Sequence, residues 1–148
     1  MEGILFIGIQ ASGKSTFYKE QFFNTHVRIS LDLLHTRNKE SQLLEKCLEL
    51  QQRVVVDNTN PTVEDRRQYI EKFRQNKYKV VGYYFQSKLE DALERNQNRA
   101  GKQKVPEKGI RSTYSKLELP SREEGFDELY YVEIKDGQFI INEWQDEI

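Results

Sequence analysis

The sequence predicts an α/β fold in which helices flank a mostly parallel β-sheet. Short apolar runs that suit strands buried on both faces alternate with segments of helical periodicity. Asp136-Gly137, near the end of the chain, is typical of a two-residue turn between antiparallel strands. Ligands of such folds bind at the carboxyl ends of the strands, so we expect the functional residues at that edge of the sheet.

Four apolar runs are predicted as strands inside the sheet: residues 4–7, 26–30, 54–57 and 80–85. Helices are predicted after each of them: one after Lys14, a long one that runs through Leu43 to Leu50, one that Pro61 opens and one that starts at Ser87. Asn60 should cap the third helix, and Ser87 to Glu90 have the form of a capping box for the fourth. A further helix is expected after Pro106, and two short edge strands or a hairpin should close the chain at residues 130–134 and 138–142.

With 148 residues, the chain is predicted to form one domain spanning residues 1–148. A net charge of −1 excludes a uniformly basic nucleic-acid coat protein. Cys47 is the only cysteine, which excludes a disulfide within the chain and a cysteine-based zinc cluster, and favours a reducing cytoplasm. The amino-terminal apolar run is too short for a signal peptide or a spanning helix, so we expect no membrane association.

Residues 8–15 match the phosphate-loop pattern GxxxxGK[ST], directly after the first predicted strand and before the first predicted helix. The glycines let backbone N–H groups point at phosphate oxygens, Lys14 reaches the β and γ phosphates, and the Ser15 hydroxyl can bind Mg²⁺. The positive end of the following helix strengthens the site. We expect a nucleoside triphosphate to lie against one continuous segment: Gly8, Ile9, Gln10, Ala11, Ser12, Gly13, Lys14, Ser15 and Thr16.

The class of enzyme is narrowed by what the sequence lacks. It contains no NKxD motif and no DxxG after a hydrophobic strand, which argues against a GTPase, and it is shorter than most motor or remodelling ATPases. A small kinase is left. Asp32 follows the second predicted strand, where a carboxylate can accept the proton of a substrate hydroxyl or cap the next helix. Asp57 ends the third strand, where it can hold magnesium or form a turn with the residues that follow.

Arg95 and Arg99 are four residues apart, which places them on one face of a predicted helix, just before the loop at residues 100–104. A mobile lid that delivers a guanidinium can neutralise charge on a transferring phosphoryl group, and a solvated helix face is the alternative. Between positions 95 and 116, seven Lys and Arg stand against one acid, whereas acids prevail after Leu117. We therefore predict a basic lid at about residues 88–117 that covers the triphosphate and a polyanionic acceptor.

Five segments resemble the kinase domains of the 5′-hydroxyl polynucleotide kinase family, the end-healing enzymes of phages and animals. They are GIQASGKSTF (8–17), RISLDLL (28–34), DNTNP (57–61), RNQNRAGKQKVP (95–106) and LPSREEGFDELY (119–130). The resemblance implies a sandwich of the P-loop NTPase type. It also implies that the γ-phosphate of ATP moves to the 5′-OH of DNA or RNA, in nucleic acid repair.

The same resemblance implies roles for individual residues. Lys14 and Ser15 would hold ATP and Mg²⁺, and Asp57 would support the metal and the phosphate loop. Asp32 would be the general base, and Arg99, with Arg95 nearby, would be the lid arginine.

Leu31 departs from the family pattern, in which an arginine precedes the base and is thought to help bind the phosphate of the acceptor. The residues that we consider as contacts for the acceptor are Asp32, Arg28, His35, Arg37, Asn58 and Asn60. Two other functions stay open at this point. One is a kinase of a nucleoside, sugar or other small metabolite, and the other is a regulatory protein that binds ATP without an acceptor.

Overall fold

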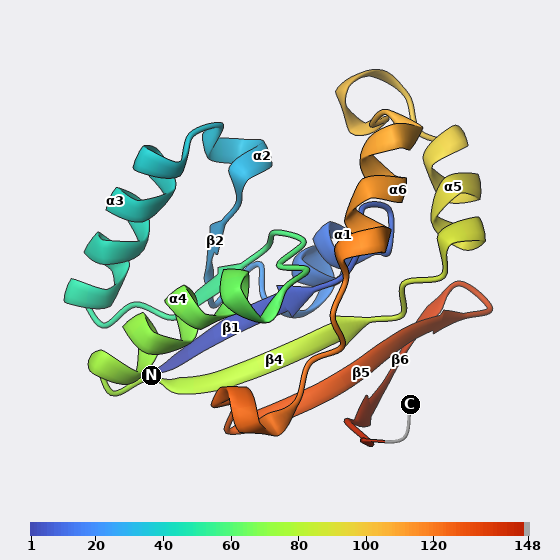
Figure 1. The fold of residues 1–148 in the computed structure, drawn as a ribbon. Helices are drawn as coiled ribbons and strands as arrows, with labels where there is room; N and C mark the ends of the chain where they lie inside the picture. The colour runs from blue at the N-terminus through green and yellow to red at the C-terminus, as the bar shows by residue number, and fades with distance from the viewer. Residues whose placement is uncertain (147–148) are drawn as a thin grey trace.

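The computed structural model describes residues 1–146 and contains a sheet of six strands in the order β2-β3-β1-β4-β5-β6 (Figure 1). Neighbours from β2 to β5 are parallel, and β6 is antiparallel to β5. The prediction of a mostly parallel sheet is confirmed. The strands are β1 (Glu2–Ile7), β2 (Val27–Ile29), β3 (Val54–Val56), β4 (Lys79–Phe85), β5 (Glu128–Lys135) and β6 (Gln138–Glu143).

Helices cover both faces of this sheet, so its central strand is buried on both sides. Leu5 and Ile7 of β1 lie in a core cluster with α3 and α4, whereas Ile4 and Phe6 pack on the other face with Phe17 of α1. The continuous apolar run of β1 is explained by this double burial. The helices are α1 (Lys14–Gln21), α2 (Leu31–Leu34), α3 (Arg37–Glu49), α4 (Val63–Gln75), α5 (Leu89–Gln97) and α6 (Glu107–Lys116), with 3₁₀ turns η1 (Gly101–Gln103) and η2 (Arg122–Glu124).

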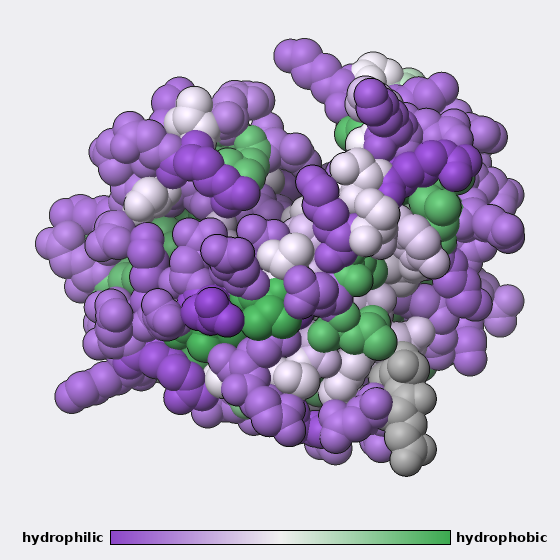
Figure 2. Space-filling model, viewed as in Figure 1, coloured by the Kyte–Doolittle hydropathy of each residue, from purple (hydrophilic) through white to green (hydrophobic). Residues whose placement is uncertain are grey.

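The carboxyl ends of the strands carry two groups of helices that stand apart (Figure 1). On one side are α2 and α3, and on the other are α5, η1 and α6. Ala92 of α5 and Ile110 of α6 form a small apolar cluster with Ile9 and Ala11 of the phosphate loop. Figure 2 shows a hollow between the two groups, with hydrophilic side chains on both walls.

The final hairpin is confirmed. Asp136 and Gly137 have φ of 52° and 73°, and both positive values belong to a turn whose twist matches that of its strands. In the described residues, no helix has the length and apolar character needed to cross a membrane.

Two predicted helix caps were wrong. Asn60 has a φ of 44°, and its side-chain amide donates to the Phe6 carbonyl at 2.7 Å, while Thr62 caps α4 by accepting from the Asp65 amide at 3.1 Å. Ser87 does not form the predicted capping box, because its hydroxyl donates to the Phe85 carbonyl and accepts from the Ile9 amide at 3.1 Å. In both cases a contact with a neighbouring strand or loop replaces the local cap.

The chain after β2 forms two helices. The long helix predicted through Leu43 to Leu50 is α3, which begins at Arg37 with the Thr36 hydroxyl as its cap. Ahead of it lies the single turn α2, which ends at His35 with a left-handed φ of 70°. Ser30 occupies the N-cap position of α2, so Asp32 lies in the first turn and does not cap it.

A buried ion pair links α4 to η2 beneath the functional edge of the sheet. The Arg66 guanidinium donates to both carboxylate oxygens of Glu124, at 2.8 and 3.1 Å, and to the Asn60 carbonyl at 3.0 Å. The two side chains are only 0% and 6% exposed. Replacing one partner leaves an uncompensated buried charge.

We therefore expect Glu124→Ala to lower the free energy of unfolding by about 3–5 kcal/mol. The matched control is Glu107→Ala, which removes the exposed pair with Arg111 and should cost less than about 1 kcal/mol. Urea unfolding of both variants measures the difference. Equal losses in the two variants would contradict this account of the buried pair.

Candidate active site

The phosphate loop joins β1 to α1 at the centre of the sheet. Gly13 stands at the N-cap of α1 with a φ of 99°, a left-handed value that favours glycine, and a Cβ atom there would lie 3.0 Å from the Ile134 and Phe139 side chains. Ala11 also has a positive φ, of 62°. The backbone of the loop therefore has a conformation in which most residue types would be strained.

Lys14 is buried within this loop, and its ammonium group donates to the carbonyls of Gly8 and Ile9, at 3.0 and 2.8 Å. Burial lowers the pKa of Lys14 to about 8, the nearby Asp57 carboxylate raises it, and Arg99 lowers it further. A desolvated cation with carbonyl partners favours the arrival of an anion. The triphosphate predicted from the sequence would supply that negative charge.

Ser15, Asp57 and Arg28 form a polar cluster next to the loop. The Ser15 hydroxyl donates to Asp57 Oδ2 at 3.1 Å, and the Arg28 guanidinium contacts both groups, with Nε 2.8 Å from Asp57 Oδ2 and Nη2 3.0 Å from Ser15 Oγ. Hydroxyl and carboxylate oxygens are the hard ligands that Mg²⁺ prefers.

Only two protein oxygens meet at this point, and the described residues contain no group of three or more His, Cys, Asp or Glu that could hold a metal ion. Mg²⁺ usually keeps several waters and is bound through one or two protein groups together with substrate phosphates. Ser15 and Asp57 therefore fit a magnesium ion that arrives with the nucleotide. Arg28 would have to release Asp57 for direct coordination, or remain beside a water-mediated contact.

The predicted catalytic residues other than Arg95 share one cleft with the two predicted metal ligands, at the carboxyl edge of the sheet. It has a volume of about 1010 Å³, and Lys14, Ser15, Asp57, Asp32 and Arg99 all line it. Asp32 is exposed on the α2 turn, at the end of β2, as its position in the sequence predicts. The order of the strands explains why Asp32, Asp57 and the phosphate loop lie close together. They follow β2, β3 and β1, which are neighbours in the sheet.

Arg95 and Arg99 do not share a helix face as predicted, because α5 ends at Gln97. Arg95 donates to the Ala11 carbonyl of the phosphate loop at 3.2 Å, whereas Arg99 donates to the Gln103 carbonyl at 3.2 Å and lines the cleft. The two arginines therefore contact different segments. A second link between the loop and the α5–α6 region is the hydrogen bond from the Gln10 amide to the Thr113 hydroxyl at 3.0 Å.

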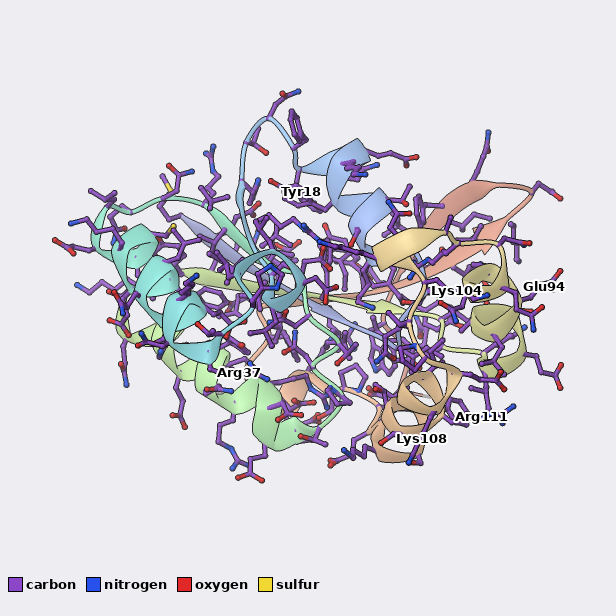
Figure 3. All side chains as sticks on the ribbon, turned by 90° about the horizontal axis from the view of Figure 1, so that it is seen from above. Tyr18, Arg37, Glu94, Lys104, Lys108 and Arg111 are labelled. Carbon is purple, nitrogen blue, oxygen red and sulfur yellow. The ribbon has the colours of Figure 1, made fainter. Side chains whose placement is uncertain are left out.

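The remaining predicted contacts lie in different parts of the cleft. His35, exposed at the end of α2, and Arg37, at the start of α3, both line the cleft. Figure 3 shows Lys108 and Arg111 on α6, well away from Arg37, and neither of them lines the cleft. Asn60 is buried with its amide engaged behind the loop, and Arg28 is turned toward the Ser15–Asp57 pair.

Sequence reasoning missed Glu40 and Tyr69. Glu40 is a buried acid on α3, and it accepts a hydrogen bond from the Tyr69 hydroxyl of α4 at 2.6 Å. A signal was present in the helical spacing, because residue 40 falls on the same face as the buried Leu44, Cys47 and Leu48. A carboxylate on an apolar helix face usually has a specific partner.

Comparison with known proteins gives a match of residues 35–120 to the family model described as "AAA domain". The chain is 30% identical to a bifunctional polynucleotide phosphatase/kinase of Schizosaccharomyces pombe, over 97% of this chain and 37% of that protein. It is 38% identical to a putative bifunctional polynucleotide phosphatase/kinase of Acanthamoeba polyphaga mimivirus, over 54% of this chain and 19% of that protein. The chain thus spans well under half the length of both relatives.

Among solved structures, Chaetomium thermophilum Kti12 in complex with ADP-AlF3 superposes with a TM-score of 0.68, covering 90% of each chain at 16% identity. At this identity the likeness concerns the fold alone. The family match covers more than half of the chain and includes α3, β3, α4 and β4. The chain therefore belongs to this family of AAA domains, and its domain is a P-loop kinase domain that resembles those of the bifunctional polynucleotide phosphatase/kinases.

Proposed function

We propose that this protein transfers the γ-phosphate of ATP to the 5′-hydroxyl end of a polynucleotide. The observation that carries the proposal is the shared cleft, in which Asp32 faces the same space as Lys14, Ser15 and Asp57. The similarity to a polynucleotide phosphatase/kinase over 97% of the chain supports this acceptor. Such an activity belongs to nucleic acid repair, and the buried free thiol of Cys47 suits a reducing compartment such as the cytoplasm.

In this proposal the backbone of residues 8–16 and the Lys14 ammonium hold the phosphates of ATP. Ser15 and Asp57 hold Mg²⁺, which when bound neutralises charge on the β and γ phosphates. Lys14 and Arg99 stabilise the negative charge that develops as the phosphoryl group moves, because both line the cleft.

Asp32 acts as the general base in the proposed mechanism. Its carboxylate accepts the proton of the 5′-hydroxyl as the oxygen attacks the γ-phosphorus and the bond to the β-phosphate oxygen breaks. The exposed position of Asp32 on α2 leaves its carboxylate accessible to an acceptor. The leaving group is ADP, whose β-phosphate keeps the oxygen that bridged it to the γ-phosphorus. The polynucleotide carries the new phosphate.

The acceptor would enter between the start of α3 and η1. Arg37 and His35 line one wall, and Lys102 lies on the facing segment η1, within the basic stretch proposed as the lid at about residues 88–117. Cations on both walls suit a phosphodiester backbone. We assign the phosphate contact that Leu31 cannot make to Arg37 or His35. Arg28 is held by Asp57 and its side chain is 26% exposed, whereas the Arg37 side chain is 63% exposed although one of its nitrogens donates to Glu40 and Tyr69.

Arg99→Ala is expected to lower the turnover of phosphate transfer by about 10–100-fold, since a removed guanidinium no longer neutralises the moving phosphoryl group. The Kd for ATP should change much less. Arg67→Ala, at an exposed position of α4 outside the cleft, is the matched control and should leave turnover unchanged. Steady-state kinetics and nucleotide titration of both variants measure this, and equal turnover in Arg99→Ala and wild type would remove Arg99 from the mechanism.

The proposed function is tested by incubating the protein with γ-labelled ATP and a panel of acceptors. The panel contains single-stranded DNA and RNA with 5′-hydroxyl ends, nucleosides and sugars. Label on the oligonucleotides supports the proposal. Label confined to a small metabolite would assign the protein to metabolite kinases, and tight ATP binding without any transfer would favour a regulatory ATP-binding protein.

A further inference from the structure

A network of polar side chains lies beneath the α2 turn. The Glu40 carboxylate is 4% exposed and accepts hydrogen bonds from the Tyr69 hydroxyl at 2.6 Å, the Asn58 amide at 2.7 Å and the Arg37 guanidinium at 3.3 Å. Arg37 also donates to the Tyr69 hydroxyl at 3.0 Å. Three donors from three different segments therefore converge on one buried carboxylate.

The network continues to the backbone of α2. The Asn58 side-chain oxygen accepts a hydrogen bond from the Leu31 amide at 2.9 Å, so Asn58 joins Glu40 to the first residue of that turn. Ser30, at the N-cap of α2, makes no side-chain cap bond, and its buried hydroxyl has no hydrogen-bond partner in the described part of the chain. Asn58 thus caps the turn from outside, because its side-chain oxygen accepts from the backbone amide of the first residue of α2.

The position of α2 decides where the Asp32 carboxylate lies. A helix of one turn has little stability of its own, and Asp32 is exposed on it, next to Leu31. An error of about 1 Å in the position of a reacting group can cost about 10²-fold in rate. The hydrogen bond to the Leu31 amide is therefore well placed to control the chemistry.

We propose that Glu40 is a positioning residue, which orients Asn58 and through it holds the α2 turn so that Asp32 meets the acceptor hydroxyl. This inference rests on the proposed function, because it assumes that Asp32 is the base. A buried carboxylate is a costly choice for a purely structural contact, since burial of the charge must be offset by its donors. Glu40 also fixes the amide of Asn58, because a carboxylate can only accept and so must face the NH₂ group.

The first test is Glu40→Gln, which keeps the size of the side chain but leaves it only one accepting oxygen. The new NH₂ group must then face either the NH₂ group of Asn58 or the donors of Tyr69 and Arg37. Turnover with a 5′-hydroxyl oligonucleotide should fall about 10–100-fold, and the Kd for ATP should stay within about twofold. Glu45→Gln is the matched control on the same helix, because Glu45 forms an exposed pair with Lys72. It should behave as wild type.

The second test exchanges the two groups. In Glu40→Gln/Asn58→Asp the carboxamide donates to the new carboxylate, which still accepts from the Leu31 amide, and turnover should recover most of the loss. Tyr69→Phe removes one donor while keeping the ring, and we expect a smaller loss of about 3–10-fold. This milder variant decides the matter if Glu40→Gln does not fold.

The third test separates positioning from a general structural role. If Glu40 acts through Asp32, then Glu40→Gln has no further effect in a protein that already carries Asp32→Asn. Losses that multiply, or a Glu40→Gln variant with wild-type turnover, would overturn the inference. A wild-type protein that does not phosphorylate any 5′-hydroxyl end would instead overturn the proposed function, so the two failures are distinguishable.

Discussion

Asp32→Asn is expected to reduce the turnover of phosphate transfer to a 5′-hydroxyl oligonucleotide by about 10²–10⁴-fold, the usual contribution of a general base. The carboxamide has nearly the same shape but cannot accept the hydroxyl proton at neutral pH. The Kd for ATP should be almost unchanged, because the phosphates are held by the loop and Lys14. Single-turnover kinetics with saturating ATP measure the effect directly.

Asp65→Asn provides the control for this substitution. Asp65 also lines the cleft, but it lies in the first turn of α4 and has no role in the proposed transfer. Its replacement should leave the rate within about twofold of wild type. If Asp32→Asn kept a comparable rate, Asp32 would not be the base, and the carboxylate that accepts the proton would have to be sought elsewhere.

Lys14→Met is expected to abolish ATP binding and transfer while it stabilises the free protein at neutral pH. Burial lowers the pKa of Lys14 from 10.5 to about 8, so holding the charged ammonium in the folded state costs on the order of 3 kcal/mol. The lost hydrogen bonds to the Gly8 and Ile9 carbonyls offset part of the gain. The net change should still be an increase in the free energy of unfolding.

The pH dependence has a definite sign. Between pH 8 and 10.5 the unfolded chain binds the Lys14 proton and the folded protein does not, so the stability of the wild type rises with pH across this interval. Lys14→Met should lose this part of the slope. Urea unfolding at pH 7 and pH 10 measures both proteins, and an identical pH dependence in the two would show that Lys14 is not desolvated in the free protein.

The parts of the fold that the sequence predicts correctly depend on short, local patterns. The Ile4–Ile7 run indicates burial on both faces, and the pair Asp136 and Gly137 can adopt the positive φ values that a tight hairpin turn requires. The phosphate loop is also predicted from a local pattern, because its conformation depends on the glycines within residues 8–15. Such features can be predicted without knowing which distant residues they contact.

The predictions that were wrong involve contacts across the fold. Ser87 would cap a helix in isolation, but the Ile9 amide offers it a partner from a neighbouring loop. Asn60 is drawn to the Phe6 carbonyl in the same way. The hydrogen bond that holds the α2 turn and the network of Glu40 were not foreseen, because they depend on Asn58, which lies 27 positions after Leu31.

The central claim is that a 5′-hydroxyl polynucleotide end accepts the γ-phosphate. The most direct measurement is the initial rate of label transfer from γ-labelled ATP to one oligonucleotide in two forms, with a free 5′-hydroxyl and with that hydroxyl already phosphorylated. We predict ATP- and Mg²⁺-dependent labelling of the first form only, at its 5′ end, and loss of this labelling in Asp32→Asn. No labelling of the free 5′-hydroxyl form by folded protein that binds ATP would contradict the account.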